Sequence, residues 1–225
     1  MFWILLLADI IADYPLQSDR LVVAKKRLPG LVIHVAIHWV VMTLLLWSVI
    51  AIVWPYILAI VAIHFAIDSF KNYLGRIRPH WVINTYLLDQ LLHVTSLVLV
   101  SALMAQSTEL PIWQITKPWV AYALGLLLAT HVWFVTERIL YYRNDEQKTK
   151  INATMWPRIG VRLVVYLSIV AASLISWLLA LPAIIIIPLL YGRVNYPRWW
   201  ALLDIGVPAI SALIVRLILS IYFVR

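Results

Sequence analysis

Long apolar runs alternate along the chain with short stretches that carry most of its charged residues. Most of these runs are long enough to be transmembrane helices, because a helix needs about 20 residues to cross the hydrocarbon core of a bilayer. They lack the short alternation of apolar and polar positions that is typical of barrel strands. The runs predict helices at roughly 2–17, 31–54, 56–73, 83–105, 118–141, 160–181 and 199–223. The sequence therefore predicts an all-α protein, a polytopic transmembrane helix bundle of about seven spans.

Two apolar stretches need separate interpretation. The segment Leu181–Tyr191 is short and contains Pro182 and Pro188, and Pro interrupts helices. It is interpreted as a re-entrant piece, a kinked helix extension or part of an eighth crossing, and the sequence leaves these alternatives open. The first run, Phe2 to Leu16, has no basic start and contains two carboxylates. We therefore expect a short first helix and not a cleavable signal peptide.

Four of the predicted helices each carry two ionisable side chains spaced four residues apart. This spacing puts both members of a pair on one helix face. Ionisable groups in hydrocarbon cost several kcal/mol each unless they find partners, and they usually mark a functional site. The pairs are Asp9 and Asp13, His34 and His38, His64 and Asp68, and Asp89 and His93. Together they predict one polar centre inside a membrane bundle.

Composition supports a membrane location. Of the 225 residues, 64% are hydrophobic and only 12% are charged, whereas a soluble domain is nearer half apolar and a quarter charged. The absence of Cys excludes disulfides and thiolate metal sites, so any metal must use oxygen and imidazole ligands. The net charge of +8 suggests anionic lipid headgroups as partners. Nucleic acid is not expected as a partner, because no base-reading motif is present.

The basic residues gather in three of the predicted loops, at 18–27, 71–78 and 138–162. The connections on the other side, at 54–55 and 107–117, carry few charges. The positive-inside rule therefore puts the three basic loops in the cytoplasm and the N-terminus outside. In the longest loop we expect a solvated topology signal formed by Arg143, Lys148, Lys150 and Arg158.

This orientation puts all four pairs in the cytoplasmic leaflet. Residues 1–106 are thus predicted to form a four-helix half that holds the polar site. Residues 107–225 are predicted to be an apolar helical scaffold half of the same membrane domain. In this second half a lone His131 is interpreted as a packing residue. Asp204 and Arg216 lie on similar faces of the last helix, so they are expected to pair with neighbours or across an oligomer.

The polar residues of the first half also form a recognisable pattern. Its elements are Ala8-Asp9, the run from Asp13 to Arg20, His34, His64-x-x-x-Asp68-x-x-Lys71, and Leu88-Asp89-Gln90-x-x-His93. Over about residues 1–105 this pattern resembles the bacterial membrane family catalogued as domain of unknown function 3307. The family often has His at the position of Asp9, which keeps a metal ligand but changes the charge of the site. The resemblance implies a shared polar site in a bacterial inner membrane, and no particular activity.

The eight paired residues offer four imidazoles and four carboxylates, enough for one or two divalent ions. Imidazole suits Zn, Mn or Fe, and carboxylates suit Mg, Mn and Fe, so the expected cofactor is Zn, Mn or Fe. Gln17 and Gln90 are expected to support the ligands or the substrate, and Asp68 either binds directly or orients a His. A structural polar network, with about 1 kcal/mol per hydrogen bond between helices, is the alternative.

Three functions are compatible with this sequence. The first is a metal-dependent hydrolase of a lipid-like substrate, with Asp13, Asp68 and Lys71 as its catalytic residues. In that case Lys71 either pairs with Asp68 or holds a phosphate. The second is a proton- or cation-coupled transporter, because chains of Asp and His relay protons. The third is a structural subunit, as a homo-oligomer or part of a larger membrane assembly.

Overall fold

The computed structural model describes residues 1–108, 110–111, 117–174 and 198–223. Within these ranges every regular element is a helix, which confirms the all-α prediction. The chain divides into two compact units, the N-terminal unit Met1–Thr116 and the C-terminal unit Lys117–Arg225. The segment Leu181–Tyr191 lies outside the described residues, so an eighth crossing stays a prediction.

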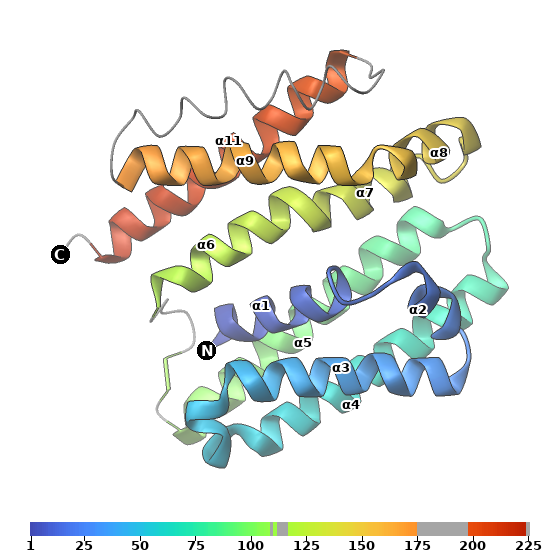
Figure 1. The fold of residues 1–225 in the computed structure, drawn as a ribbon. Coiled ribbons are helices and arrows are strands. Elements are labelled where there is room, and N and C mark those ends of the chain that lie inside the picture. Colours follow the sequence, from blue (N-terminus) through green and yellow to red (C-terminus); the bar gives the residue numbers. More distant parts are fainter. Residues whose placement is uncertain (109, 112–116, 175–197, 224–225) are drawn as a thin grey trace. The chain divides into compact units, whose positions relative to one another are not determined.

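The N-terminal unit is a helix bundle whose first helix packs between longer ones (Figure 1). α1 contacts α3 and α5, α4 contacts the same two helices, and α2 contacts α3. The end of α1, the start of α3, the end of α4 and the start of α5 lie near α2, and we call this end of the unit the α2 end. The helices are α1 (Phe2–Asp13), α2 (Asp19–Ala24), α3 (Leu28–Leu45), α4 (Ile50–Ile77) and α5 (Val82–Thr108).

In the C-terminal unit, one helix is continuous from α6 through a π-helical turn, η2, into α7. α11 packs against α9 and α6, and α8 lies between α7 and α9 in the sequence. The elements are α6 (Pro118–Leu127), η2 (Leu128–Val132), α7 (Trp133–Leu140), α8 (Asp145–Ala153), α9 (Met155–Leu174) and α11 (Arg198–Phe223).

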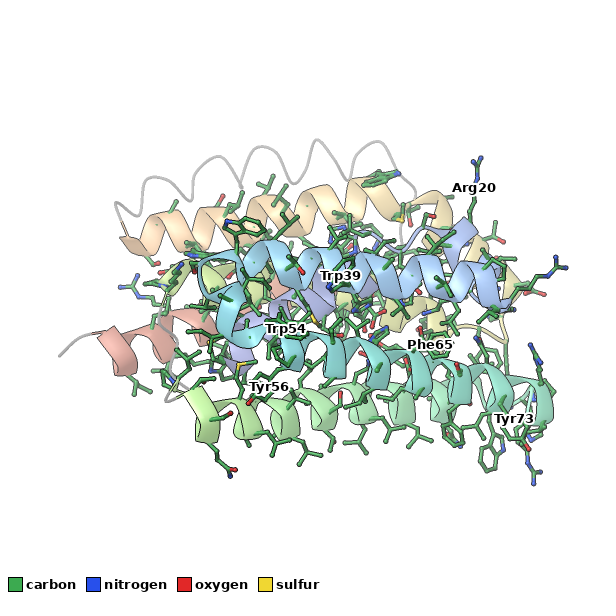
Figure 2. All side chains as sticks on the ribbon, turned by 90° about the horizontal axis from the view of Figure 1, so that it is seen from below. Arg20, Trp39, Trp54, Tyr56, Phe65 and Tyr73 are labelled. Carbon is green, nitrogen blue, oxygen red and sulfur yellow. The ribbon has the colours of Figure 1, made fainter. Side chains whose placement is uncertain are left out.

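Six helical segments of the described chain are long and apolar enough to span a membrane, close to the predicted seven. α1 has 12 residues and is about 18 Å long at 1.5 Å per residue, too short to cross a bilayer alone. Figure 2 shows side chains covering the outer faces of the bundle, among them Trp39 and Trp54, which are about half exposed. Large exposed apolar side chains of this kind are suited to contact with lipid.

The connections differ from the predicted ones at two places. The break between the second and third helices lies at Leu46–Val49, where a short 3-10 turn precedes α4, and not at Trp54–Pro55. Pro55 sits inside α4, because a membrane helix tolerates the loss of one backbone hydrogen bond. Two predicted loops contain the short helices α2 and α8, which are N-capped by Ser18 and Asn144.

Apolar and polar side chains occupy opposite halves of the N-terminal unit. The apolar core contains Phe2 and Leu5 from the start of α1 and Leu46 from the C-terminus of α3. Val53 near the start of α4 and Met104 near the end of α5 belong to the same core. These residues all lie away from the α2 end. The half nearer α2 is therefore left for the titratable pairs.

Candidate metal centre

All eight titratable residues of the four pairs lie in one buried cluster in the α2 half of the N-terminal unit. α1, α3, α4 and α5 each contribute two, as the i, i+4 spacing requires. None of the eight side chains is more than 9% exposed. Their ligand atoms form three overlapping sets, each within 4.8 Å: Asp13, His34, His38 and His64; Asp9, Asp13, His64 and His93; and Asp68, Asp89 and His93.

Two of the four carboxylates face only imidazoles. Asp9 Oδ1 lies 3.4 Å from His38 Nδ1 and 3.5 Å from His64 Nδ1. Asp13 Oδ1 lies 3.2 Å from His34 Nε2 and 3.4 Å from His38 Nε2. Among the described residues, no Lys or Arg side chain forms an ion pair with either carboxylate. Two buried negative charges thus lie side by side among rings that are neutral in their ordinary form.

The other two carboxylates are each paired with a Lys. Lys25 Nζ lies 3.2 Å from Asp68 Oδ2, and Lys71 Nζ lies 2.5 Å from Asp89 Oδ2. The prediction that Lys71 pairs with Asp68 was therefore wrong, because Lys71 pairs with Asp89 and Lys25 pairs with Asp68. Lys25 was expected in a basic loop, yet it is only 7% exposed. Lys25 follows α2 directly. A helix of six residues gives too weak a sequence signal to predict that the Lys25 side chain points into the bundle.

Several ligand atoms are buried without any hydrogen bond. Both ring nitrogens of His38 are among them, although an oxygen of Asp9 and an oxygen of Asp13 each lie 3.4 Å from one of them. The His38 and His64 rings approach to 3.6 Å between centroids. Buried polar atoms are almost always hydrogen-bonded, so atoms that converge without such bonds fit a ligand set for a cation. The same condition holds for Asp9 Oδ1, His64 Nδ1, Asp89 Oδ1 and His93 Nε2.

The predicted supporting residues occupy different positions around the cluster. Gln90 Nε2 donates to Asp89 Oδ2 at 3.2 Å, and Gln90 Oε1 accepts from the Tyr14 hydroxyl at 2.9 Å. Gln90 thus holds a carboxylate of the cluster directly. Gln17 Nε2 instead donates to the backbone carbonyl of Asp13 at 2.5 Å, so its side chain contacts the end of α1 and not the carboxylate.

The cluster carries an excess of negative charge. Asp9, Asp13, Asp68 and Asp89 are four carboxylates, and the two Lys ammonium groups offset only half of that charge. With neutral imidazoles, two negative charges are left in a buried site. Charge in a low-dielectric interior is costly unless it is compensated, so the cluster requires either one divalent cation or two additional protons.

A second buried charged network lies in the C-terminal unit, and it is balanced. Arg158 Nε donates to Asp204 at 2.7 Å and its Nη2 to Glu137 at 2.9 Å. Arg162 Nε donates to Asp204 at 2.7 Å and its Nη2 to Glu137 at 2.9 Å. The guanidinium of Arg158 also lies 4.5 Å from the centre of the Trp200 ring. Two guanidinium groups and two carboxylates leave no excess charge.

This network corrects one expectation from the sequence and confirms that Asp204 pairs with neighbouring residues. Arg158 is fully buried and is not part of a solvated topology signal, whereas Arg143, Lys148 and Lys150 are exposed. The reason is that α9 begins at Met155 and carries Arg158 on its inner face. Asp204 pairs with guanidinium groups of α9, while Arg216 donates to the Ser173 carbonyl. His131 Nδ1 lies 3.0 Å from the Thr130 hydroxyl, a local contact that fits a packing residue.

The fold and the cluster together define a helical membrane-type protein with a buried Asp/His centre. The chain belongs to the family described as "Protein of unknown function (DUF3307)", whose sequence profile matches residues 1–121. The matched region contains every residue of the Asp/His cluster and both Lys that pair with it. Comparisons with curated proteins and with solved structures gave no match.

Proposed function

We propose that the N-terminal unit binds a divalent cation and that the protein is a metal-dependent membrane hydrolase of a lipid-like substrate. The observation that carries the proposal is the pair of buried carboxylates, Asp9 and Asp13, that face only imidazoles. A divalent cation held by the cluster would supply the two positive charges that the cluster lacks. It also gives partners to the buried ring nitrogens of His38 and His64 that make no hydrogen bond.

The donor set favours a transition metal. Imidazole is a common ligand of Zn and Fe, and carboxylate oxygen is added for Mn and Fe. A cage rich in imidazole suits Mg or Ca poorly, because these ions prefer all-oxygen ligands. The proposed ion is therefore Zn, Mn or Fe, with Asp13, His34, His38 and His64 as its proposed ligand set.

The proposed reaction follows from what lies next to this ligand set. A divalent ion held by Asp13, His34, His38 and His64 would supply activation of a water and polarisation of a phosphoryl or acyl oxygen. Asp13 and Asp68 lie within the cluster and are placed to accept a proton. The Lys71 side chain is 30% exposed while its ammonium group pairs with Asp89, so Lys71 lies at the edge of the cluster, where an anionic headgroup would approach it. Spanning helices with large exposed apolar faces surround the site, which suits a substrate that arrives from the lipid.

The position of the cluster in the unit favours access from one side only. The half of the unit away from α2 is filled by the apolar core, which contains Leu5, Met42 and Ile57. A transporter needs polar groups along a path through the bundle, and a packed apolar layer of this kind opposes one. The α2 end carries the basic residues at 20–27 and 71–78, so the positive-inside rule puts the proposed active site in the cytoplasmic leaflet of the inner membrane, with the N-terminus outside.

Elemental analysis of the full chain, purified in detergent without chelators, tests the cation. We expect about one Zn, Mn or Fe per chain in the unmodified protein, and a loss of at least about 10-fold in the double variant His38→Ala/His64→Ala. The matched control is His80→Ala/His131→Ala, which removes two His residues outside the cluster and should keep the metal. Equal metal in both double variants, or none in the unmodified protein, would contradict the proposal.

A second experiment tests the reaction. The purified protein is incubated with mixed phospholipids and with fatty-acyl esters, and the released phosphate and fatty acid are measured. We expect turnover that a chelator abolishes, that Zn or Mn restores, and that the His38→Ala/His64→Ala variant lacks. Metal binding without turnover of either substrate class would leave the cation site standing and would favour a structural or transport role. Flux across proteoliposomes then distinguishes between those two.

A further inference from the structure

Among the described residues, two sets of Asp and His side chains without a shared residue could each hold a cation. The set Asp68, Asp89 and His93 shares no residue with the set Asp13, His34, His38 and His64. The intermediate set, which contains Asp9, overlaps both. Two ligand sets without a shared residue would be expected to hold two ions. One divalent ion, however, is enough to balance the two excess negative charges of the cluster. The groups that contact the carboxylates of the second set explain why one ion is enough.

The second set is where the two ammonium groups lie. Lys25 Nζ contacts both oxygens of Asp68, at 3.4 and 3.2 Å, and lies 3.3 Å from His34 Nε2. Lys71 Nζ contacts Asp89 Oδ2 at 2.5 Å. An ammonium group is a compact point charge that donates to oxygen ligands, so it satisfies carboxylates that would otherwise bind a metal. Each carboxylate of the second set thus has a cation supplied by the chain itself.

The fold fixes the position of Lys25 closely. α2 lies so near α3 that a Cβ atom on Gly30 would overlap the carbonyl group of Ala24. The same Cβ atom would lie 2.7 Å from the backbone nitrogen of Lys25. Asn72 Nδ2 donates to the Lys25 carbonyl at 2.8 Å, and this contact ties the same backbone to α4. Close packing and a side-chain hydrogen bond therefore both hold Lys25 over the cluster. A basic residue in a solvated loop would require neither close backbone packing nor a hydrogen bond to hold it in place.

We infer that Lys25 and Lys71 occupy a second divalent-cation position as tethered cations and so limit the centre to one metal ion. This inference rests on the proposed cation site. Without the two Lys, four buried carboxylates would require four positive charges, which two divalent ions supply. Asp68, Asp89 and His93 are then free to bind the second ion. The two Lys would thereby set the stoichiometry of the centre.

The test compares metal content in matched variants of the full chain in detergent, each loaded with Zn²⁺ or Mn²⁺ and freed of excess ion. Lys25→Met/Lys71→Met removes both ammonium groups and keeps similar side-chain volume. We expect it to bind about two ions per chain, against about one in the unmodified protein. The control Arg20→Met/Lys26→Met removes two exposed basic residues of the segment that carries Lys25 and should bind about one ion.

The outcomes separate this inference from the proposed function. About one ion in both the unmodified protein and Lys25→Met/Lys71→Met overturns the inference and leaves the first cation site intact, and about two ions in the unmodified protein also overturns it. No ion in the unmodified protein overturns both. Should the double variant fail to fold, Lys25→Met and Lys71→Met are measured singly. Uptake above that of the unmodified protein in either supports the inference, and unchanged uptake in both overturns it.

Discussion

At the residue scale, burial alone does not determine what a carboxylate does. Asp13, Asp68 and Asp204 are all buried and titratable. Asp204 accepts hydrogen bonds from two guanidinium groups, Asp68 has an ammonium group, and Asp13 has only imidazoles. The partner therefore decides whether a buried carboxylate needs a metal. A residue whose charge is already balanced serves structure, and one whose charge is not balanced is a candidate ligand.

A first prediction concerns Asp13. Replacement by Asn removes one of the two carboxylates that face imidazoles and leaves a similar volume. We expect metal affinity to fall at least about 100-fold, because a direct ligand and one of two uncompensated charges are lost. Titration with Zn²⁺, followed calorimetrically in detergent, measures the change. Asp145→Asn, at an exposed position of α8, is the control and should bind metal as the unmodified protein does.

A second prediction concerns Asp204. The variant Asp204→Asn leaves Arg158 and Arg162 with Glu137 as their remaining carboxylate. Breaking a buried ion pair costs about 3–5 kcal/mol, so Tm should fall by roughly 10 °C in a thermal melt in detergent. Glu146→Gln is the control. The hydrogen bond from Lys150 lowers the pKa of the Glu146 carboxyl, but both side chains are exposed, so Tm should stay unchanged. Equal Tm values for the two variants would show that the network is not structural.

At the element scale, a short helix decides the chemistry of the cluster. α2 has only six residues, and its own sequence gives no reason for it to cover the end of a bundle. Its position depends on Gly30, where the absence of a side chain allows α2 to approach α3. A glycine inside an apolar helix normally weakens that helix. Here close packing offsets this weakness, and the consequence is the ammonium group of Lys25 at Asp68.

A third prediction follows from this packing. Gly30→Ala should lower Tm, because its Cβ atom would overlap the backbone of Ala24, and it should raise metal uptake, because Lys25 moves away from Asp68. Gly75→Ala is the matched control in the same unit. A Cβ atom there meets nothing within 4 Å, so helix propensity alone should stabilise the variant by about 0.5–1 kcal/mol. Thermal melts and elemental analysis of both variants measure the two effects, and a Gly30→Ala variant that behaves like Gly75→Ala would contradict this role.

At the scale of the whole molecule, the two units handle buried charge differently. The C-terminal unit balances it with its own guanidinium groups, and the N-terminal unit has two negative charges in excess. If the N-terminal unit binds the proposed cation, its stability should depend on that cation, whereas the stability of the C-terminal unit should not. The family match at residues 1–121 covers the unit with the excess charge.

A fourth prediction tests this dependence. Removal of metal by a chelator should lower the Tm of the unmodified protein, because a ligand at about 100 times its Kd contributes about 2.7 kcal/mol. The variant Asp9→Asn/Asp13→Asn has no excess charge and should melt at the same temperature with and without chelator. Asp145→Asn should respond to chelator as the unmodified protein does. A chelator effect of equal size in all three proteins would place the metal elsewhere.

Much of the fold could be predicted from the sequence because the signals are local. Apolar runs predict spanning helices, and i, i+4 spacing predicts which side chains share a face, as for His34 and His38. Helix boundaries were less predictable. Pro55 suggested a break that lies instead at Leu46–Val49, and the start of α9 at Met155 was hidden in a polar stretch. Those boundaries depend on how helices pack, which no single segment encodes.

The sequence by itself determined that eight titratable groups lie on the inner faces of four apolar helices, because the cost of exposing charge to hydrocarbon leaves them no other place. Only the tertiary structure decided which charges meet. It brought Lys25 to Asp68, Lys71 to Asp89, and Arg158 to Asp204, and it left Asp9 and Asp13 with imidazoles alone. The physical reason is that ion pairing depends on distances between helices, whereas the sequence pattern records only positions along each one.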